Sequence, residues 1–514
     1  MRSTMWEAGA STPPIDAAVI DVGSNSVRLV LYRVEGRAVW TVFNEKILAG
    51  LGRDLAVTGR LSPEGMESAM AALRRFAALL AASKPDRIFA AATAAARDAE
   101  DGPEFCRQIG LETGIDLRVL SGKEEARYSA LGVLAGAPSS HGLVGDLGGA
   151  SLELIRLDRG APGDGVTLPL GPFSFKDTGR FDADRVRSQV ERKLKPHAGR
   201  LQTPVFHAVG GAWRNLALLA MRMSGYPLEI VHQYEMTRRE ALETAKVISR
   251  QSRGSLERIE GISRRRLDTL PHAAAVLETL VNNLGVERVI LSAYGLREGL
   301  LFDAMTTALR SQDPLLEGCA ALSAREGAHA DLGPALESWL LPAFSVLEPV
   351  FESRELVLLG AACRLADLGA RLHPDHRADL IFHQVLRAPI PGMTHAERVF
   401  LAVACFSRHT AALTHPEPLM VARLLTHERL QRARSLGAAI RLACDLSGSS
   451  PELLARARLE MRPNTVILEA EEAFAPILLG EQTAKRAMTL ATLLERELKM
   501  RAATSERVRR ETAA

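Results

Sequence analysis

The stretch from Ala18 to Val34, AVIDVGSNSVRLVLYRV, places two aliphatic runs on either side of a polar turn. Short runs rich in Val, Ile and Leu, separated by Gly, Ser and Asn, are typical of a β-hairpin. The turn is entered through Asp21, at the end of the first run. The stretch therefore predicts two strands with a carboxylate at a strand end, and the elements that follow decide which fold contains them.

The same order of elements is predicted twice in succession. After the hairpin, the periodicity predicts a third strand and then helix, strand, helix, strand and helix, up to about residue 137. From His141 the order starts again with GLVGDLGGASLELIRL, in which Asp146-Leu147-Gly148 repeats the pattern of Asp21-Val22-Gly23. Two copies that each open with an Asp-x-Gly hairpin predict a duplicated α/β protein, in which the two turns face each other across a cleft.

A change of composition marks the rest of the chain. From about Ser311 the strand signals disappear and Leu, Ala, Arg and Glu dominate, with one strand-like run at Asn464–Ala470. This composition predicts an all-helical region. We therefore expect three domains: an α/β domain at 16–137, a second at 138–309 and a helical domain at 310–514.

The overall composition argues against several classes of protein. The 514 residues carry 64 basic and 61 acidic side chains, a net charge of +3, which indicates neither a nucleic-acid partner nor an anionic membrane. No run of about 18 uncharged apolar residues occurs, and the N-terminus lacks the pattern of a signal peptide. The five cysteines do not have the spacing of a metal site. We expect a soluble, cytoplasmic protein.

The two turns have the chemistry of phosphate-binding loops. Turns rich in Gly and Ser can direct several backbone N–H groups at one point and so hold phosphate oxygens. An ordinary turn would explain either one alone, but the repetition at equivalent positions favours a site. The candidates are Gly23, Ser24 and Asn25 in the first turn, and Gly148, Gly149 and Ser151 in the second. The carboxylates of Asp21 and Asp146 can hold a divalent cation, and we expect Mg²⁺.

Three charged residues follow other predicted strands. Arg97 comes just after a strand end, where a guanidinium can grip a phosphate with two parallel hydrogen bonds. Glu124 and Glu125 come near the start of a helix, again just after a strand. Carboxylates there also interact favourably with the helix dipole. We favour a functional role because ligands of α/β proteins bind at the carboxyl ends of the strands.

Taken together, six segments resemble a known family. They match, in the same order, the motifs of the exopolyphosphatase and guanosine pentaphosphate phosphohydrolase family, over about residues 16–305. The resemblance implies an actin-like fold, of the RNase H-like, sugar kinase and heat-shock ATPase type, and Mg²⁺-dependent hydrolysis of a terminal phosphoanhydride. The segments are IDVGSNSVRL, SGKEEARYSALGV, GDLGGASLELI, LPLG (Leu168–Gly171), GISRRRLDTLPHAAAVL and SAYGLREGLL.

The resemblance also implies roles for single residues. Glu125 would position and deprotonate the attacking water. Asp146 and Glu153 would serve the metal, with Asp21 in the first phosphate hairpin nearby. Arg97 and the two Gly/Ser turns would grip the phosphates. Charge neutralisation, an in-line water and a base are what phosphoanhydride hydrolysis requires.

The sequence departs from the family pattern at three places. Ala150 stands where the family usually has a third glycine of the second turn. Trp213 lies in a Gly-Gly turn that replaces a Thr-rich one, and it either stacks on a base or belongs to the core. The helical C-terminal region resembles a degenerate HD phosphohydrolase domain, because Ala366-Asp367 stands where a His-Asp pair is expected.

The leading hypothesis is an exopolyphosphatase that releases orthophosphate from inorganic polyphosphate. The alternative within the same class is a guanosine pentaphosphate (pppGpp) phosphohydrolase, and the alternative from another class is a nucleotide-gated actin-like binding module. We expect a homodimer without a nucleic-acid or membrane partner. Three Arg-rich segments, 263–270, 377–387 and 429–443, are candidates for a basic track that binds long polyphosphate.

Overall fold

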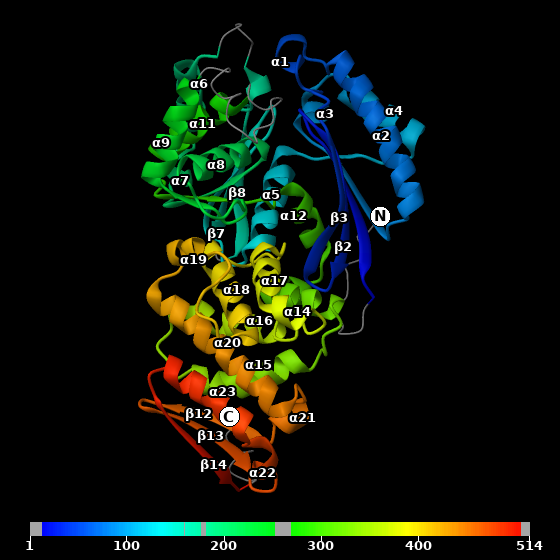
Figure 1. Cartoon of the computed structure of the whole chain (residues 1–514). Helices are drawn as coiled ribbons and strands as arrows, with labels where there is room; N and C mark the ends of the chain where they lie inside the picture. Colours follow the sequence, from blue (N-terminus) through cyan, green and yellow to red (C-terminus); the bar gives the residue numbers. More distant parts are fainter. Residues whose placement is uncertain (1–12, 159, 176–180, 252–268, 505–514) are drawn as a thin grey trace. The chain divides into compact units, whose positions relative to one another are not determined.

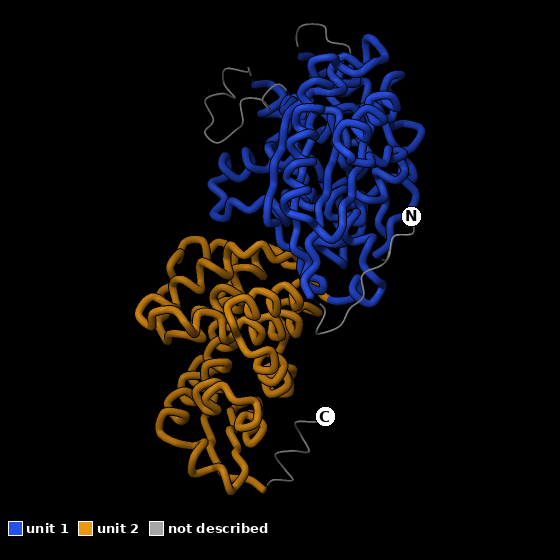
Figure 2. Tube along the Cα trace, turned by 90° about the vertical axis from the view of Figure 1, so that its right-hand side faces the viewer, with its two compact units in different colours: residues 1–312 blue, residues 313–514 orange. Residues whose placement is uncertain are grey.

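The computed structural model of the chain describes residues 13–158, 160–175, 181–251 and 269–504. The chain divides into two compact units, residues 1–312 and 313–514 (Figure 2). The first unit contains two β-sheets with helices between and around them, whereas the second is mainly helical (Figure 1).

The first sheet has five strands in the order β3-β2-β1-β4-β5. Strand β1 pairs antiparallel with β2 and parallel with β4, so the opening hairpin is the centre of the sheet. Both faces of β1 are buried, which explains its unbroken run of apolar residues. The strands are β1 (Ile15–Val22), β2 (Val27–Glu35), β3 (Ala38–Ile47), β4 (Arg87–Ala92) and β5 (Arg118–Val119).

The second sheet repeats this topology. Its order is β10-β11-β9-β6-β7-β8, so that β8-β7-β6-β9-β11 corresponds to β3-β2-β1-β4-β5 of the first sheet. The predicted duplication and the actin-like fold are confirmed, with β10 as an additional antiparallel edge strand. The strands are β6 (Gly142–Leu147), β7 (Leu152–Asp158), β8 (Ala161–Leu168), β9 (Val205–Val209), β10 (Glu235–Thr237) and β11 (Arg288–Leu291).

The helices of the first unit follow the predicted alternation with the strands. Helix α2 begins at Pro63, directly after Ser62, and buries Met70, Leu73 and Leu80 on one face. The helices are α1 (Leu55–Thr58), α2 (Pro63–Ser83), α3 (Ala94–Asp98), α4 (Gly102–Thr113), α5 (Gly122–Gly136), α6 (Ala183–Leu194), α7 (Ala198–Leu201), α8 (Gly211–Met223), α9 (Arg238–Arg250), α11 (Leu270–Asn283), α12 (Leu296–Ala304) and α13 (Thr307–Ser311), with a 3₁₀ turn at Pro172–Ser174.

Helices α5 and α12 cross in direct backbone contact between the two sheets (Figure 1). A Cβ atom on Gly132 would lie 2.1 Å from the carbonyl oxygen of Gly295, and one on Gly299 would lie 1.8 Å from that of Tyr128. The two glycines therefore permit an approach that any side chain would block. Apolar residues of both sheets pack against this helix pair in one cluster.

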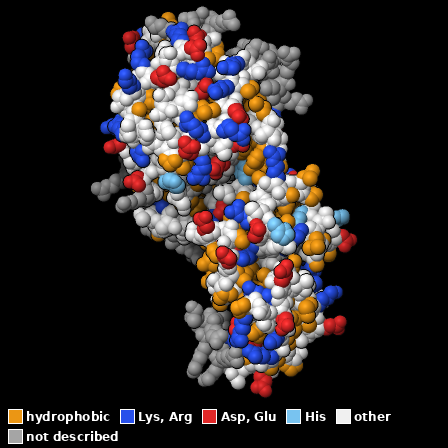
Figure 3. Space-filling view, turned by 90° about the vertical axis from the view of Figure 1, so that its left-hand side faces the viewer, with side chains coloured by type: hydrophobic (Ala, Val, Ile, Leu, Met, Phe, Trp, Pro, Cys, Tyr) orange, Lys and Arg blue, Asp and Glu red, His pale blue; other side chains and the backbone are white. Residues whose placement is uncertain are grey.

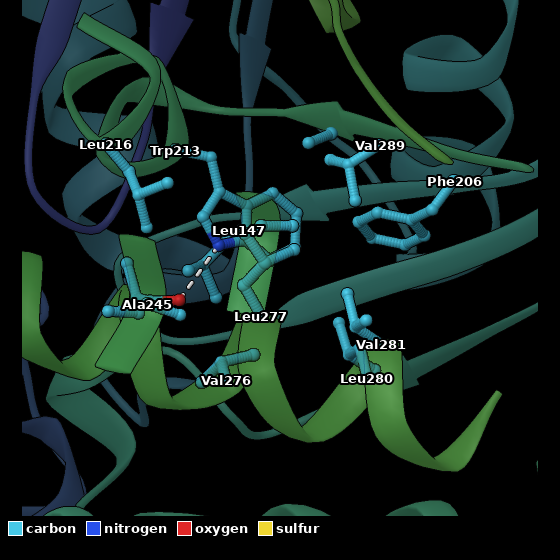
Figure 4. Packing of buried hydrophobic residues seen from close by; sticks show 14 of the residues in the cluster. Leu147, Phe206, Trp213, Leu216, Ala245, Val276, Leu277, Leu280, Val281 and Val289 are labelled. Atoms are coloured by element: carbon cyan, nitrogen blue, oxygen red, sulfur yellow. Dashed lines mark hydrogen bonds between the residues drawn. The ribbon is translucent and has the colours of Figure 1, made fainter. Parts of the chain in front are cut away.

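The core of the second half surrounds Trp213 of α8 (Figure 4). Its side chain is buried, its indole N–H donates to the carbonyl oxygen of Ala273 at 3.0 Å, and its ring meets that of Phe206 edge to face. Of the two interpretations of Trp213, the structure therefore confirms the core residue.

The second unit confirms the predicted helical character, but the prediction that it is all helical is wrong. Strands β12 and β13 form a hairpin, and β14 adds to it in parallel. The helices are α14 (Pro314–Arg325), α15 (Leu332–Phe344), α16 (Glu355–Arg364), α17 (Pro374–Arg387), α18 (His395–His409), α19 (Pro418–Leu424), α20 (His427–Ser447), α21 (Pro451–Leu454), α22 (Ala475–Leu478) and α23 (Glu481–Leu493), with a 3₁₀ turn at Glu352–Arg354. The strands are β12 (Ala457–Arg462), β13 (Thr465–Glu471) and β14 (Glu497–Ala503).

Buried ion pairs explain why two of these strands escaped prediction. Glu469 of β13 is buried and bonded to Arg458 of β12 and Arg501 of β14. Charged residues thus occupy positions that would be apolar in an ordinary half-buried strand, and they hide the alternation. In the part of the chain that the structure describes, no helix has the length and apolar character needed to cross a membrane.

Candidate active site

The two predicted turns are built in the same way. In the first, which joins β1 to β2, the backbone N–H of Gly23 donates to the carbonyl oxygen of Ser26 at 2.9 Å. In the second, which joins β6 to β7, the N–H of Gly148 donates to the carbonyl oxygen of Ser151, also at 2.9 Å. The duplication therefore extends from the sheet topology to a single hydrogen bond.

The segment after the third strand of each half braces the corresponding turn. Gly50 donates to the carbonyl oxygen of Asn25 at 3.1 Å, and in the second half Gly171 donates to that of Ala150 at 3.0 Å. The sequence had singled out Leu168–Gly171 of the second brace but had missed its counterpart in the first half. The detectable signal was Gly50, which follows the end of β3 at the same distance at which Gly171 follows the end of β8.

The two turns face each other closely, as predicted. A Cβ atom on Gly149 would lie 3.1 Å from the Cβ of Ser24 and 3.3 Å from that of Asn25. A side chain at position 149 would be in tight contact with the first turn, so the glycine allows this close approach. The turns border a cleft of about 440 Å³.

Most of the predicted site residues line this cleft. They are Asp21, Gly23, Ser24, Asn25, Glu125, Asp146, Gly148, Gly149 and Ser151. Two of the predicted residues, Arg97 and Glu153, are not among the lining side chains. Both interact electrostatically with side chains that line the cleft: Arg97 with Glu125, and Glu153 with Glu125 and Asp146.

Glu125 lies in the first turn of α5 and is almost fully buried, with 7 % of its surface exposed. Its Oε2 accepts a hydrogen bond of 3.0 Å from Nη1 of Arg97. Burial raises the pKa of Glu125 to about 7, and the nearby carboxylates of Asp146 and Asp21 act in the same direction, while Arg97 opposes them. A carboxylate with a pKa near neutrality can accept a proton efficiently.

The neighbouring Glu124 has a different, structural environment. Its side chain accepts hydrogen bonds from the backbone N–H and the hydroxyl of Ser121, which closes a capping box at the start of α5. It also contacts Arg118, away from the cleft. From the sequence, either glutamate could have stabilised the start of the helix. In the structure it is Glu124 that does so.

Asp146 and Glu153 are direct partners across the β6–β7 ladder. The hydroxyl of Ser129, four residues after Glu125 on α5, donates to Oδ2 of Asp146. Glu153 is buried, with 1 % exposed, and its Oε1 has no hydrogen-bond partner within the described residues. Burial raises the pKa of both carboxyl groups, and for Glu153 repulsion from Glu125 and Asp146 adds to the effect.

This carboxylate group suits a divalent cation. Among the residues that the structure describes, no three His, Cys, Asp or Glu side chains are already arranged to hold a metal ion together. Mg²⁺ usually needs only one or two protein carboxylates, because waters and substrate oxygens complete its coordination. The free Oε1 of Glu153 and the mutual repulsion of the carboxylates are what a bound cation would relieve, so the residues fit the ion.

Asp21 is neutralised by arginine. Nη1 of Arg297, at the start of α12, donates to its Oδ2 at 3.0 Å. In the β1–β2 ladder the direct partner of Asp21 is Arg28, whereas the equivalent partner of Asp146 is Glu153. The position that carries a carboxylate in the second half therefore carries a guanidinium in the first.

The cleft is also lined by four basic side chains that were not predicted as site residues. They are Arg28, Lys46, Arg214 and Arg297. Arg297 had a usable signal, because it follows the end of strand β11 in the second sheet as Glu125 follows the equivalent strand β5 in the first. The cleft thus combines acidic and basic groups, as a site for a phosphate anion with a cation would.

Comparison with known proteins agrees with this arrangement. The model of the Ppx/GppA phosphatase family matches residues 30–308, and that of the exopolyphosphatase C-terminal domain matches residues 316–500. The chain belongs to the Ppx/GppA phosphatase family. It is accordingly a hydrolase of phosphate compounds, and the resemblance noted from its motifs is confirmed.

Solved structures of Ppx/GppA proteins share the fold of the first unit. The family member from Aquifex aeolicus is 24 % identical, with a TM-score of 0.50, and the alignment covers 57 % of this chain and 97 % of that chain. An exopolyphosphatase from Cytophaga hutchinsonii is 22 % identical, with a TM-score of 0.52 and coverage of 57 % and 99 %. At this level of identity the likeness shows the fold alone.

Ala150, which stands where the Ppx/GppA family usually has glycine, does not strain the second turn. Ala150 does not adopt a positive φ, so its Cβ atom is compatible with the backbone there. Ala150 is nearly buried and its carbonyl oxygen accepts the brace from Gly171. The second turn therefore keeps its shape without the third glycine.

Proposed function

We propose that the protein is a Mg²⁺-dependent exopolyphosphatase, which hydrolyses the terminal phosphoanhydride of inorganic polyphosphate and releases orthophosphate. The observation that carries the proposal is Glu125, a buried carboxylate with a pKa near 7 in a cleft between two phosphate-type turns. The basic side chains and backbone amides beside it suit an extended phosphate anion.

Substrate binding relies on the turns and on the basic residues. Backbone N–H groups and hydroxyls of the two turns contact the oxygens of the terminal phosphate, and Arg28 and Lys46 neutralise the charge of the units that follow. Both basic residues lie in the first half, on β2 and β3. The chain end is thereby fixed close to Glu125.

The chemical step needs a water molecule in line with the bridging P–O bond. Glu125 accepts a proton from this water, the water oxygen bonds to the terminal phosphorus, and the bridging oxygen leaves with the shortened chain. Arg97 holds the carboxylate of Glu125 in place through its bond to Oε2. The products are orthophosphate and a polyphosphate shorter by one unit.

Asp146 and Glu153 would hold the Mg²⁺ ion. When bound, the ion supplies positive charge to the phosphate oxygens. Ser129 fixes one oxygen of Asp146 and leaves the other near Gly210, at the floor of the cleft. The protein residues thus set the orientation of the carboxylate before the ion arrives.

The lining of the cleft favours polyphosphate over pppGpp. No aromatic side chain is among the described residues that line it, and Trp213 is enclosed in the core. A guanine base would therefore lack a stacking partner within this described lining, whereas a polyphosphate chain requires none.

The test is phosphate release from polyphosphate, pppGpp and ATP, with Mg²⁺ and with a chelator. We expect Mg²⁺-dependent release with the highest kcat/KM on polyphosphate, and strongly reduced release by Glu125→Gln protein. A higher kcat/KM on pppGpp would identify the alternative activity. Binding of ATP without release of phosphate from any of the three would instead identify a nucleotide-gated binding module.

A further inference from the structure

The second unit contains a pocket of about 500 Å³ that has no part in the proposed hydrolysis. It is bounded by the end of α18, the segment that follows it, α20 and α23. Its apolar lining is aliphatic, and Leu413 and Met488 remain 62 % and 53 % exposed. The apolar side chains are Ala411, Ala412, Leu413, Ala438, Met488 and Leu493.

The charged lining of this pocket is entirely basic. Among the described residues that line it, four are cationic and none is Asp or Glu; the four are Arg434, Arg441, Lys485 and Arg486. Arg486 is paired with Asp445 outside the lining. Within the described residues, Arg441 has no hydrogen-bond or ion-pair partner.

The basic groups of the pocket also repel one another. Half burial lowers the pKa of Arg441, the positive charges of Arg486 and Arg408 lower it further, and the charge of Asp445 opposes them. Arg434 donates to the carbonyl oxygen of Leu413, yet its buried Nε has no hydrogen-bond partner within the described residues. An anion in the pocket would relieve both the repulsion and the lost hydrogen bonds.

We propose that this pocket binds a small amphipathic anion with one acidic head and a saturated hydrocarbon tail. The head lies against Arg441 and its basic neighbours, and the tail lies against Leu413, Met488 and the alanines. On the face of the second unit drawn in Figure 3, exposed hydrophobic side chains lie among side chains of Lys, Arg, Asp and Glu. Such surfaces in soluble proteins commonly mark binding sites.

The aliphatic lining decides between kinds of anion. No aromatic side chain on which a nucleobase could stack is among the described residues of this lining, so a nucleotide would find no stacking partner among them. Inorganic polyphosphate would use the cations but would leave the apolar walls facing a polar chain. A hydrocarbon tail with an anionic head uses both halves of the lining.

The test is isothermal titration of the full chain with 1-octanesulfonate, a tailed anion that a phosphatase cannot hydrolyse. Ethanesulfonate lacks the tail, 1-octanol lacks the charge, and tripolyphosphate lacks any apolar part. The variants are Arg441→Gln and Met488→Ser, with Lys499→Gln on β14 as a control outside the pocket. Melting temperatures establish that each variant is folded.

We expect one octanesulfonate to bind per chain, with ethanesulfonate and octanol each at least about tenfold weaker. Arg441→Gln should weaken octanesulfonate about tenfold and leave octanol unchanged, since it removes only the charged contact. Met488→Ser should weaken octanesulfonate and spare ethanesulfonate, and Lys499→Gln should bind like the wild type.

Two results would overturn the proposal. One is equal binding of octanesulfonate by the wild type and by folded Arg441→Gln protein, or no binding by either. The other is displacement of octanesulfonate by tripolyphosphate with loss of tripolyphosphate binding in Arg441→Gln, which would assign the pocket to inorganic polyanions. Neither result depends on hydrolysis, so this test is independent of the test of the proposed function.

Discussion

Two adjacent glutamates of α5 have different surroundings and should respond differently to the same substitution. Glu125→Gln keeps the shape of the side chain but removes the proton acceptor, so kcat should fall by about 10²–10⁴ with little change in KM. Glu124→Gln keeps an oxygen for the capping box and should lower kcat by less than about threefold. Steady-state phosphate release measures both.

Equal losses of kcat in the two variants would contradict the assignment of the base to Glu125. Folding is controlled by comparing the melting temperature of each variant with that of the wild type. Glu124 serves as the matched control because it has the same side chain one position away, on the same helix.

Arg97 should set the pH range in which Glu125 works. Its hydrogen bond and charge hold the pKa of Glu125 down against burial, and the base is active only when deprotonated. In Arg97→Ala protein the pKa of Glu125 should therefore rise, and the acid limb of the kcat/KM profile should move up by about one pH unit. Arg97→Lys keeps the charge and should shift the limb less.

An unchanged acid limb in Arg97→Ala protein would mean that the arginine does not contact the base in the working enzyme. A loss of kcat/KM at all pH values with no shift would instead identify a phosphate-binding arginine. Measurements from about pH 5.5 to 9 span the acid limb expected for a base with a pKa near 7 and its upward shift.

At the residue scale, motifs locate carboxylates better than they locate cations. Asp21, Asp146 and Glu125 stand beside glycine-rich turns or helix starts, and these local patterns predict a strand end. Arg28 and Lys46 occupy strand positions that look like any solvated position in the sequence. Only the folding of β2 and β3 beside the second half brings these two side chains to the cleft.

At the element scale, the brace of the second turn can be broken by one methyl group. A Cβ atom on Gly171 would lie 2.5 Å from backbone atoms of Ala150, and backbone cannot move aside as a flexible side chain can. Gly171→Ala should lower the free energy of unfolding by about 1–3 kcal/mol and reduce kcat/KM, because the turn is displaced. Denaturant titration and phosphate release provide the two measurements.

Gly199→Ala is the matched control, since nothing lies within 4 Å of a Cβ atom built there. This variant should equal or slightly exceed the wild type in stability, because alanine favours the helical conformation of α7. Wild-type activity and stability in Gly171→Ala protein would show that the brace is not needed.

The elements that could be predicted from the sequence have regular periods. The hairpin strands of both halves and helix α2 follow simple patterns of apolar residues. Strand β10 is only three residues long, and β12 and β14 carry arginine and glutamate in paired positions. Their apolar pattern is too short or too interrupted to be recognised, and tertiary pairing determines them instead.

At the scale of the whole molecule, Mg²⁺ should stabilise the protein in a pH-dependent way. Carboxyl groups with raised folded pKa values are ionised at a cost, so the metal-free protein loses stability as the pH rises from their unfolded pKa values through the folded ones. At about pH 8 a bound cation offsets this cost, and at about pH 5 protons already do so.

We therefore expect saturating Mg²⁺ to raise the melting temperature by about 3 °C or more at pH 8, and by much less at pH 5. The Glu153→Gln variant should lose most of this difference. An equal shift at both pH values, or a shift that persists in Glu153→Gln protein, would place the cation elsewhere. Calorimetric scans in chelator and in Mg²⁺ provide the comparison.

The contribution of the second unit to long substrates can be tested by ending the chain after Gln312. Of the Arg-rich segments, 263–270 lies largely outside the described residues. In 429–443, Arg429 donates to the carbonyl oxygen of Val350, and Arg432 is paired with Glu355. Much of the charge in that segment is thus engaged within the second unit. The same holds for 377–387, where Arg377 donates to the carbonyl oxygen of Leu372 and Arg387 is paired with Glu417.

We expect the folded fragment to hydrolyse tripolyphosphate like the full chain but to show a higher KM for long polyphosphate, with a weaker dependence of KM on salt. The measurement is KM against chain length at two salt concentrations. Equal KM values for long chains would place the track in the first unit. The second unit would then have another role, such as formation of the expected homodimer. Light scattering of both proteins would report dimer formation.

The two hairpins carry opposite charges at one equivalent position, so the two sides of the cleft differ. A polyphosphate chain has the same repeating unit along its whole length, so a symmetric groove would accept it equally well in either sense. Here Arg28 faces Asp21 on one side, and Glu153 faces Asp146 at the equivalent place on the other. For the proposed polyphosphate substrate, the body of the chain would lie toward the guanidinium of Arg28 and its end toward the carboxylates of Asp146 and Glu153. The difference of one side chain between the two hairpins would then decide which side of the cleft receives the chain end.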